Sequence, residues 1–255
     1  MTQKPDPIHL LDLPVHPVTL NQAVMVVESA VLRRRKTGAL RHIALNAAKV
    51  VACEKDDALR SVVQQAGLVT ADGVGVLLLA RRLGARLPER VTGIDLMDAL
   101  CARAALRGWP IYLLGARKGV ADAAASTLRA RHPSLRVAGT HHGYFNPEDD
   151  TGIAAQVRAS EARLLFVGMS TPRKERFVHE QADHAGVDFA MGVGGAFDVL
   201  SHRVKRAPVW LQGAGLEWAW RWAQEPRRLF PRYGVDGARF LLRVAAGREG
   251  SDTRT

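Results

Sequence analysis

Short apolar runs alternate with stretches in which apolar residues recur at helical spacing along most of this chain. The runs contain few polar positions, so they favour strands that are buried on both faces rather than strands with one solvent-exposed face. Buried strands separated by amphipathic helices are typical of a parallel sheet covered by helices on both sides. The predicted strands span residues 42–46, 68–70, 110–115, 136–139, 163–168 and 187–193.

Helical spacing of apolar residues fills the intervals between these runs, whereas residues 1–18 are Pro-rich and predict a loop or an edge strand. We therefore predict an α/β fold with a mostly parallel, Rossmann-like sheet, helices on both faces and a C-terminal helical appendage. No self-similar period indicates a solenoid. The predicted helices span residues 19–36, 56–66, 74–83, 95–107, 118–131, 150–161 and 172–185.

The composition of the C-terminal region differs from that of the rest of the chain. The 255 residues hold 36 Lys and Arg against 25 Asp and Glu, a net charge of +11. Residues 200–255 carry 11 of these cations against 5 acids, together with four of the five tryptophans. We predict a catalytic core over 1–199 and a basic, Trp-rich appendage over 200–255. Such a charge excess indicates an anionic partner: nucleic acid, a membrane surface or a phosphorylated substrate.

The cysteines and the N-terminal residues indicate in which cellular compartment the protein works. Cys53 and Cys101 have small apolar neighbours and are too few for a disulfide framework or a structural zinc site, so we expect both to be buried structural residues. The first residues lack the apolar run of a secretory signal, and no run approaches the ~20 apolar residues that span a bilayer. We expect a cytoplasmic protein whose membrane association is peripheral.

Polar and Gly-rich residues follow several predicted strands, at the edge where open α/β sheets bind ligands. One strand ends at Asn46 and another at Gly115, which opens a turn to Gly119. That turn suits either phosphate binding by backbone amides or simple helix–strand packing without a ligand. The last strand leads into the Gly-rich stretch 192–195, followed by Asp198, which can accept hydrogen bonds from a ribose or a base.

Asp72 is the most suggestive acid, because it follows a strand and precedes Gly73 and a helix. At such a place a carboxylate serves either as a general base or as a helix N-cap. His141 and His142 are adjacent, but no acid or cysteine stands at ligand spacing from them. We therefore expect no metal site and no cofactor.

Three ordered blocks resemble the WecG/TagA/CpsF family of bacterial glycosyltransferases. The blocks are Ala71-Asp72-Gly73-Val74-Gly75, then Arg90-Val91-Thr92-Gly93-Ile94-Asp95-Leu96, and a long stretch that runs from Gly192 through Val204-Lys205-Arg206-Ala207-Pro208 to Leu229. Their order and spacing agree with the family over roughly residues 20–243. The resemblance implies inverting transfer of a sugar from a UDP-sugar to a sugar carried on a polyprenyl diphosphate, in cell-surface or exopolysaccharide biosynthesis.

The resemblance also implies roles for single residues. Asp72 matches the family's catalytic acid and would take the proton of the acceptor hydroxyl, while Arg90 would help to stabilise the leaving UDP. The remaining implied residues bind substrate. They are Asn46, Thr92, Gly115, Lys174, Gly194 and Asp198 toward the donor, and Tyr144 near the uracil.

Departures from the family pattern concern the donor sugar. Ala44 stands where members of the N-acetylmannosamine type usually carry Thr, Lys174 stands where Gln is common, and His202 stands where Gly is common. A cation at position 174 would support diphosphate binding or recognise an acidic or plain hexose. These differences favour a UDP-glucose-type donor, with UDP-N-acetylmannosamine or its uronic acid as the alternatives.

The resemblance gives the basic appendage a role as well. Tryptophans and arginines interleaved in a helical appendage suit the membrane interface, which implies a peripheral enzyme on the cytoplasmic face of the inner membrane. Arg221, Arg227, Arg228 and Arg232 would meet the anionic leaflet and the lipid diphosphate. The alternative is a nucleic-acid-binding α/β protein that uses the same basic region, although no nucleic-acid fold signature supports it.

Overall fold

The structure, a computed structural model, describes residues 4–33, 38–230 and 234–246, without the side chains of Arg228, Arg243 and Ala246. Arg232 and the side chain of Arg228, both expected at the lipid diphosphate, therefore lie outside the described residues.

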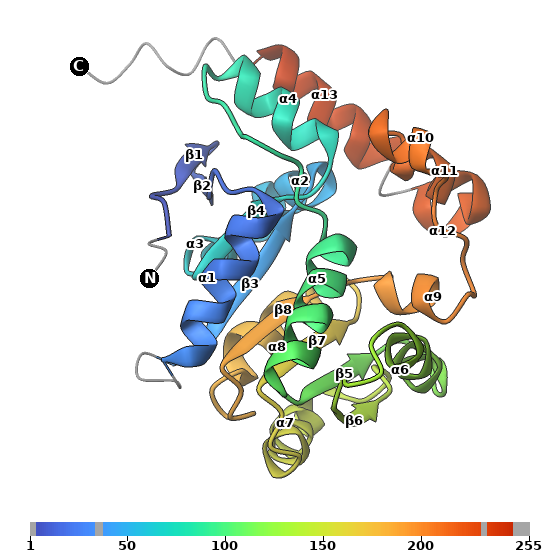
Figure 1. Ribbon diagram of the computed structural model, residues 1–255. Helices are drawn as coiled ribbons and strands as arrows, with labels where there is room; N and C mark the ends of the chain where they lie inside the picture. Colours follow the sequence, from blue (N-terminus) through green and yellow to red (C-terminus); the bar gives the residue numbers. More distant parts are fainter. Residues whose placement is uncertain (1–3, 34–37, 231–233, 247–255) are drawn as a thin grey trace.

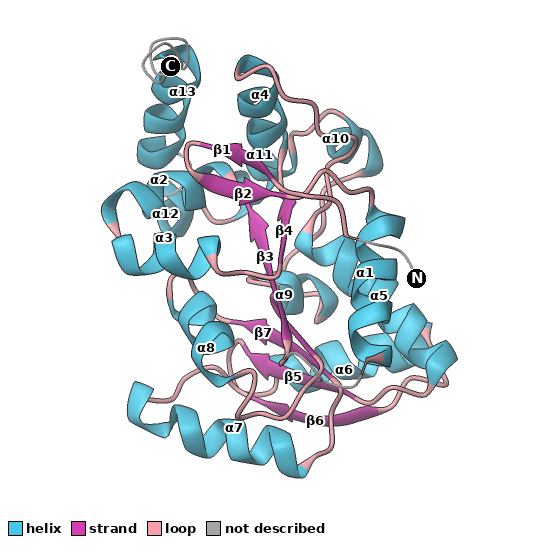
Figure 2. Ribbon diagram, turned by 90° about the vertical axis from the view of Figure 1, so that its left-hand side faces the viewer, coloured by secondary structure: helices cyan, strands magenta, loops and turns pink. Residues whose placement is uncertain are grey.

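A six-stranded sheet in which every neighbouring pair is parallel forms the centre of the molecule (Figure 2). The strand order is β4-β3-β8-β7-β5-β6, so β8 and β7 lie between the β3–β4 pair and the β5–β6 pair. This confirms the predicted α/β fold with a parallel sheet. The strands are β3 (Leu40–Leu45), β4 (Leu68–Ala71), β5 (Ile111–Gly115), β6 (Val137–His141), β7 (Leu164–Gly168) and β8 (Phe189–Gly192).

Helices cover both faces of this sheet (Figure 1), as the non-alternating strands predicted. One face packs against α1 (Leu20–Leu32), α5 (Gly93–Arg107), α6 (Val120–Arg131) and α9 (Ala196–Leu200). The other face packs against α2 (Ala47–Lys55), α3 (Asp57–Gln64), α4 (Val74–Arg82), α7 (Asp150–Ala159) and α8 (Arg173–Gln181). A short 3-10 turn, η1 (Pro147–Asp149), precedes α7.

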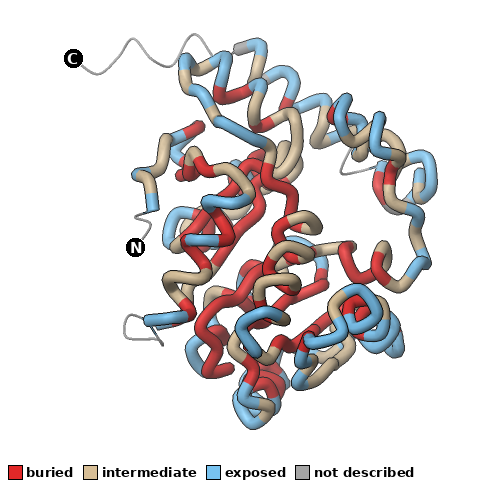
Figure 3. The backbone as a smooth tube through the Cα atoms, viewed as in Figure 1, coloured by how far each residue is buried: buried red, intermediate tan, exposed pale blue. Residues whose placement is uncertain are grey.

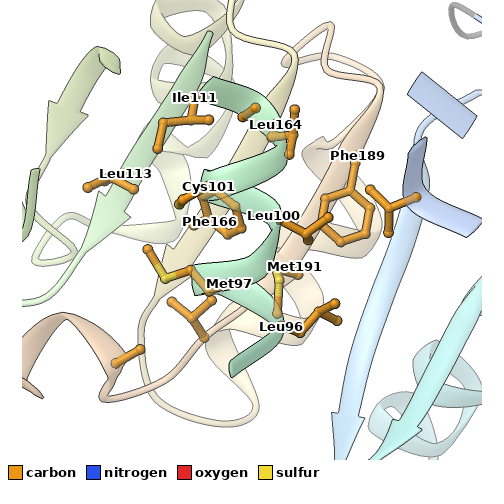
Figure 4. Close-up of a cluster of buried hydrophobic side chains, with 14 of the residues drawn as sticks. Leu96, Met97, Leu100, Cys101, Ile111, Leu113, Leu164, Phe166, Phe189 and Met191 are labelled. Carbon is orange, nitrogen blue, oxygen red and sulfur yellow. The ribbon is translucent and has the colours of Figure 1, made fainter. Parts of the chain in front are cut away.

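The core between α5 and the strands is densely apolar. Leu100 and Cys101 of α5 are fully buried against Phe166 and Phe189 of β7 and β8 (Figure 4). Cys53 is buried in the core on the opposite face, which confirms that both cysteines occupy buried positions. β4, β5 and β7 are buried along their whole length, the edge strand β6 is only half-buried, and the helices keep exposed outer faces (Figure 3).

The largest departure from the predicted elements lies between β3 and β4. The sequence predicted one helix over 56–66, whereas the chain forms α2 from Ala47 and then α3, with Asp56 between them. Asp56 ends α2 and accepts a hydrogen bond from the backbone N–H of Leu59, so it caps α3. The periodicity did not reveal α2 because that helix carries buried residues on more than one side, including Lys49.

The N-terminal stretch forms a two-stranded antiparallel hairpin of β1 (Ile8–Leu10) and β2 (Leu13–Val15). At the other end lie α10 (Val209–Gly213), α11 (Glu217–Gln224), α12 (Pro226–Phe230) and α13 (Asp236–Ala246). Helix α13 runs beside α4 and packs on α2 (Figure 1). Its Phe240 is 3% exposed and belongs to the same apolar core as β3 and β4. The described C-terminal helices therefore share buried surface with the α/β core.

Candidate functional site

Asp72 and Asn46 lie side by side at the carboxyl ends of β4 and β3. The N–H of Asp72 donates to the carbonyl of Leu45 at 2.7 Å, so the pairing of the two strands continues to the acid itself. Gly73 follows with φ +112° and occupies the N-cap position of α4. Asp72 thus lies one residue before the cap, at the point where the chain leaves the sheet. Asn46 caps α2, its side-chain oxygen accepting from the N–H of Lys49 at 3.1 Å.

The segment before α5 lies against the end of β4. The N–H of Val91 donates to the carbonyl of Ala71 at 2.9 Å, which places Arg90 and Thr92 on either side of this bond, near Asp72. Arg90 reaches from there to the C-terminal helices: its guanidinium pairs with Glu217 of α11 at 2.9 Å and donates to the carbonyl of Gln212 at 3.1 Å. The predicted cation therefore joins the carboxyl edge of the sheet to the appendage.

A chain of polar contacts extends this junction. Thr92 caps α5, and its hydroxyl donates to Asp95 at 2.6 Å. Asp95 also pairs with Arg206, whose Nε lies 3.6 Å from Glu217. Thr92 is buried, so its hydroxyl is committed to ordering this network.

The Gly-rich turn after β8 brings together two residues that the sequence assigned to different tasks. Gly194 adopts φ +53°, and Asp198 follows in α9. Arg221 of α11 lies directly over the turn, with Nη1 3.4 Å from the carbonyl of Gly195 and Nη2 3.9 Å from Asp198. A Cβ at Gly195 would stand 2.4 Å from the Arg221 guanidinium, so this approach requires glycine. Arg221 therefore lies at the sheet edge with Asp198.

His202, which stands where the family commonly has glycine, adopts φ +59°. This left-handed backbone favours glycine, and a histidine there is tolerated less readily. The residue lies beside a cavity of about 390 Å³ whose lining includes Ile94, Val199 and Arg206.

Gly115 ends β5 and Tyr144 follows β6, toward the opposite side of the same edge. Gly115 has φ +140°, and a Cβ there would stand 2.5 Å from the backbone of Gly168. Close packing of β5 on β7 therefore accounts for this glycine. Tyr144 is 69% exposed, and its N–H donates to His142 Nδ1 at 3.3 Å. With neighbouring strands about 4.8 Å apart, β3 and β6 are separated by about 19 Å, so Tyr144 is distant from Asn46.

Lys174 belongs to a buried charge cluster that the sequence did not reveal as a unit. Its Nζ lies 2.8 Å from Glu175 Oε1, and Lys49 Nζ lies 2.9 Å from the same oxygen. All three side chains are less than 10% exposed. Burial opposes ionisation of Glu175, but the Lys49 and Lys174 ammonium groups outweigh it and lower the pKa of Glu175 to about 2.

Lys49 is the member of this cluster that sequence reasoning missed, and one signal was available. It stands in the first turn of a helix that begins at a strand end, where the helix dipole disfavours a cation. Lys49 also donates to the carbonyl of Ala44 at 2.7 Å, and Lys174 passes beneath Gly192, whose Cβ would stand 2.9 Å from Lys174 Cδ. The cluster therefore lies under the carboxyl ends of β3 and β8.

Within the described ranges, no three His, Cys, Asp or Glu side chains gather closely enough to hold a metal ion. The predictions of no metal and no cofactor stay predictions. Likewise, none of the described helices combines the length and the apolar character needed to cross a bilayer.

A comparison with protein families identifies the chain's relatives. The family model described as "Glycosyl transferase WecG/TagA/CpsF family" matches residues 8–253, which is nearly the whole chain. The match covers the carboxyl-edge residues Asp72, Arg90 and Asp198 together with the C-terminal helices that contact them. Proteins of this kind are glycosyltransferases of cell-surface polymer biosynthesis. This chain belongs to the WecG/TagA/CpsF family of glycosyltransferases.

Proposed function

We propose that the protein transfers a sugar from a UDP-sugar to a saccharide carried on a polyprenyl diphosphate, with inversion at the anomeric carbon and Asp72 as the general base. The observation that carries this proposal is the position of Asp72. Its carboxylate stands where β4 ends, next to Asn46 and to the segment that bears Arg90 and Thr92. Carboxyl ends of parallel strands are where open α/β sheets bind their ligands.

In the proposed step, the acceptor hydroxyl oxygen forms a bond to the anomeric carbon while the bond from that carbon to the diphosphate oxygen breaks. The hydroxyl proton passes to the Asp72 carboxylate, and the electron pair of the broken bond leaves with UDP. Asp72 would act as general base because its carboxylate stands at the strand end, where open α/β sheets bind their ligands. Arg90 and the N-termini of α2 and α9 supply positive charge for the leaving diphosphate.

The donor would lie along the carboxyl edge, the sugar near Asn46 and Asp72 and the uracil toward Tyr144. Gly194 allows the backbone to approach the ligand closely, and Asp198 would accept a hydrogen bond from the nucleoside. The sequence difference that favours a donor other than N-acetylmannosamine is Lys174, which stands where the family commonly has Gln. We favour a UDP-glucose-type sugar, with N-acetylmannosamine or its uronic acid as the alternatives.

The C-terminal helices support docking on the cytoplasmic face of the inner membrane. Val209 and Trp210 of α10 are 82% and 71% exposed, and Leu241 and Leu242 of α13 are 65% and 70% exposed. Exposed apolar side chains together with exposed cations of the same helical region, such as Arg227 of α12, suit the boundary between headgroups and acyl chains. The lipid diphosphate of the acceptor would then approach Arg221 at the sheet edge.

Replacing Asp72 by Asn tests the catalytic part. The full-length protein is incubated with a panel of UDP-sugars and a short-chain polyprenyl-diphosphate saccharide, and the product mass is read. We expect Asp72→Asn to lower turnover by about 10²- to 10⁴-fold, the usual contribution of a general base, while UDP binding persists. Asp57→Asn, at an acid whose side chain is 93% exposed on α3, is the matched control and should leave turnover unchanged. Turnover near the wild-type value in Asp72→Asn would refute the assigned base.

A further inference from the structure

Val91 is attached to β4 at two points. Its N–H donates to the carbonyl of Ala71 at 2.9 Å, and its own carbonyl accepts a hydrogen bond from the hydroxyl of Thr70 at 3.3 Å. Thr70 and Ala71 are the two residues before Asp72. Both peptide groups of Val91 are therefore tied to the strand end that bears the acid, and Val91 itself is 1% exposed.

His42 lies behind this attachment, on the neighbouring strand β3. Its Nε2 is 2.9 Å from the Thr70 hydroxyl, and the side chain is 1% exposed. A hydroxyl has one proton, and Thr70 uses it on the carbonyl of Val91, so the hydroxyl must accept from His42. This assigns the proton of the neutral imidazole to Nε2. The hydrogen-bond chain consequently runs in one direction, from His42 through Thr70 to Val91.

The imidazole is neutral at the near-neutral pH of an activity assay. Burial, with the nearby charges of Lys49 and His16 adding to it, lowers the pKa of His42 to about 3. The donor at Nε2 is therefore present at every pH at which the enzyme would be assayed. His42 acts as a fixed donor in this chain and does not exchange protons with substrate.

We propose that His42 and Thr70 are positioning residues that set the distance between Asp72 and the segment bearing Arg90. The proposal rests on the proposed function, in which Asp72 takes the acceptor proton and Arg90 faces the leaving group. The hydrogen bond from His42 holds the Thr70 hydroxyl in one rotamer, and the hydroxyl holds the carbonyl of Val91 in place. Because Arg90 is the residue directly before Val91, the position of its backbone is held as well. A shift of about 1 Å between two groups of this kind is enough to lower a rate by about 10²-fold.

Thr70→Val tests the chain, because valine keeps the shape of threonine and removes the hydroxyl. We expect kcat per UDP-binding site to fall by about 10- to 100-fold, while the KM for the donor changes by less than about 3-fold. Thr70→Ser restores the hydroxyl and should recover kcat to within about 3-fold. A purely structural role would instead reduce the number of UDP-binding sites and leave kcat per site unchanged.

Two further variants separate this inference from the proposed function. His42→Phe should lower kcat in the same direction as Thr70→Val, with the midpoint of the pH–rate profile unchanged, because His42 does not titrate. In an Asp72→Asn background, Thr70→Val should cause no further loss. If Asp72→Asn is inactive and Thr70→Val retains kcat per site within about 2-fold, the positioning role is overturned and the base assignment stands. If Asp72→Asn is itself active, the result refutes the base assignment of the proposed function, on which this inference rests.

Discussion

Glu175 offers a quantitative test of the buried charge cluster. One of its oxygens receives both Lys49 and Lys174, at 2.9 and 2.8 Å, and its side chain is 2% exposed. The cluster lowers the pKa of Glu175 from 4.5 to about 2. Since one pKa unit corresponds to about 1.4 kcal/mol, the ionised carboxylate adds about 3 kcal/mol to the free energy of unfolding at pH 7.

Glu175→Gln replaces the carboxylate by a neutral group of the same shape. We expect the variant to lose about 3 kcal/mol, which corresponds to a fall of about 6–12 °C in melting temperature for a chain of this size. Urea unfolding at several pH values measures the difference. Because the folded-state pKa is lowered, the stabilisation is complete above about pH 4.5 and disappears as the pH falls toward 2. The gap between wild type and Glu175→Gln should therefore close over that interval.

Glu180→Gln, at an exposed acid on the same helix, is the matched control and should stay within about 0.5 kcal/mol of wild type. If Glu175→Gln unfolds at the same urea concentration as Glu180→Gln, the carboxylate does not hold the two lysines in the way described. A deficit that stays constant from pH 7 to pH 3 would equally refute the argument, because it would not come from ionisation.

Two other predictions follow from the fold and the appendage. Gly115→Ala should destabilise the protein by more than about 3 kcal/mol, since the new Cβ would lie 2.5 Å from the backbone of Gly168, whereas Gly119→Ala, with open space around it, should cost only about 1 kcal/mol in urea unfolding. Equal losses would contradict the packing argument. Trp210→Ser should weaken sedimentation with anionic vesicles about tenfold without lowering the melting temperature. Leu106→Ser, at another exposed apolar residue, should leave vesicle sedimentation unchanged. Unaltered vesicle binding by Trp210→Ser would contradict docking through α10.

The sequence predicted the strands, their parallel pairing and the polar residues at their ends, because buried strands and turn residues leave local patterns. It placed Asp72 and Asn46 at one edge for the same reason. It did not predict that Arg90 would pair with Glu217, which is 127 residues away in the chain. Contacts of that range depend on how the C-terminal helices fold back over the edge, and no local pattern encodes this.

Buried polar residues were the other limit of sequence reasoning. His42 and Lys49 stand within stretches that are apolar overall, and their side chains find partners only after β3, β4 and α8 come together. Such residues are costly to bury, so a lone lysine or histidine in a core element is a signal of a tertiary partner. The sequence shows that a partner is required but not which residue supplies it.

The outer side of β4 has a consequence for solubility. β4 ends the sheet on one side, and an unpaired strand there would invite pairing with another chain. His16 prevents this at Val69, whose carbonyl accepts from the His16 backbone at 2.9 Å and whose N–H donates to His16 Nδ1 at 3.0 Å. Val91 occupies the carbonyl of Ala71. The two segments thus act as blocking groups against edge-to-edge aggregation, and a variant that loosens either would expose a template for self-association before it lost its fold.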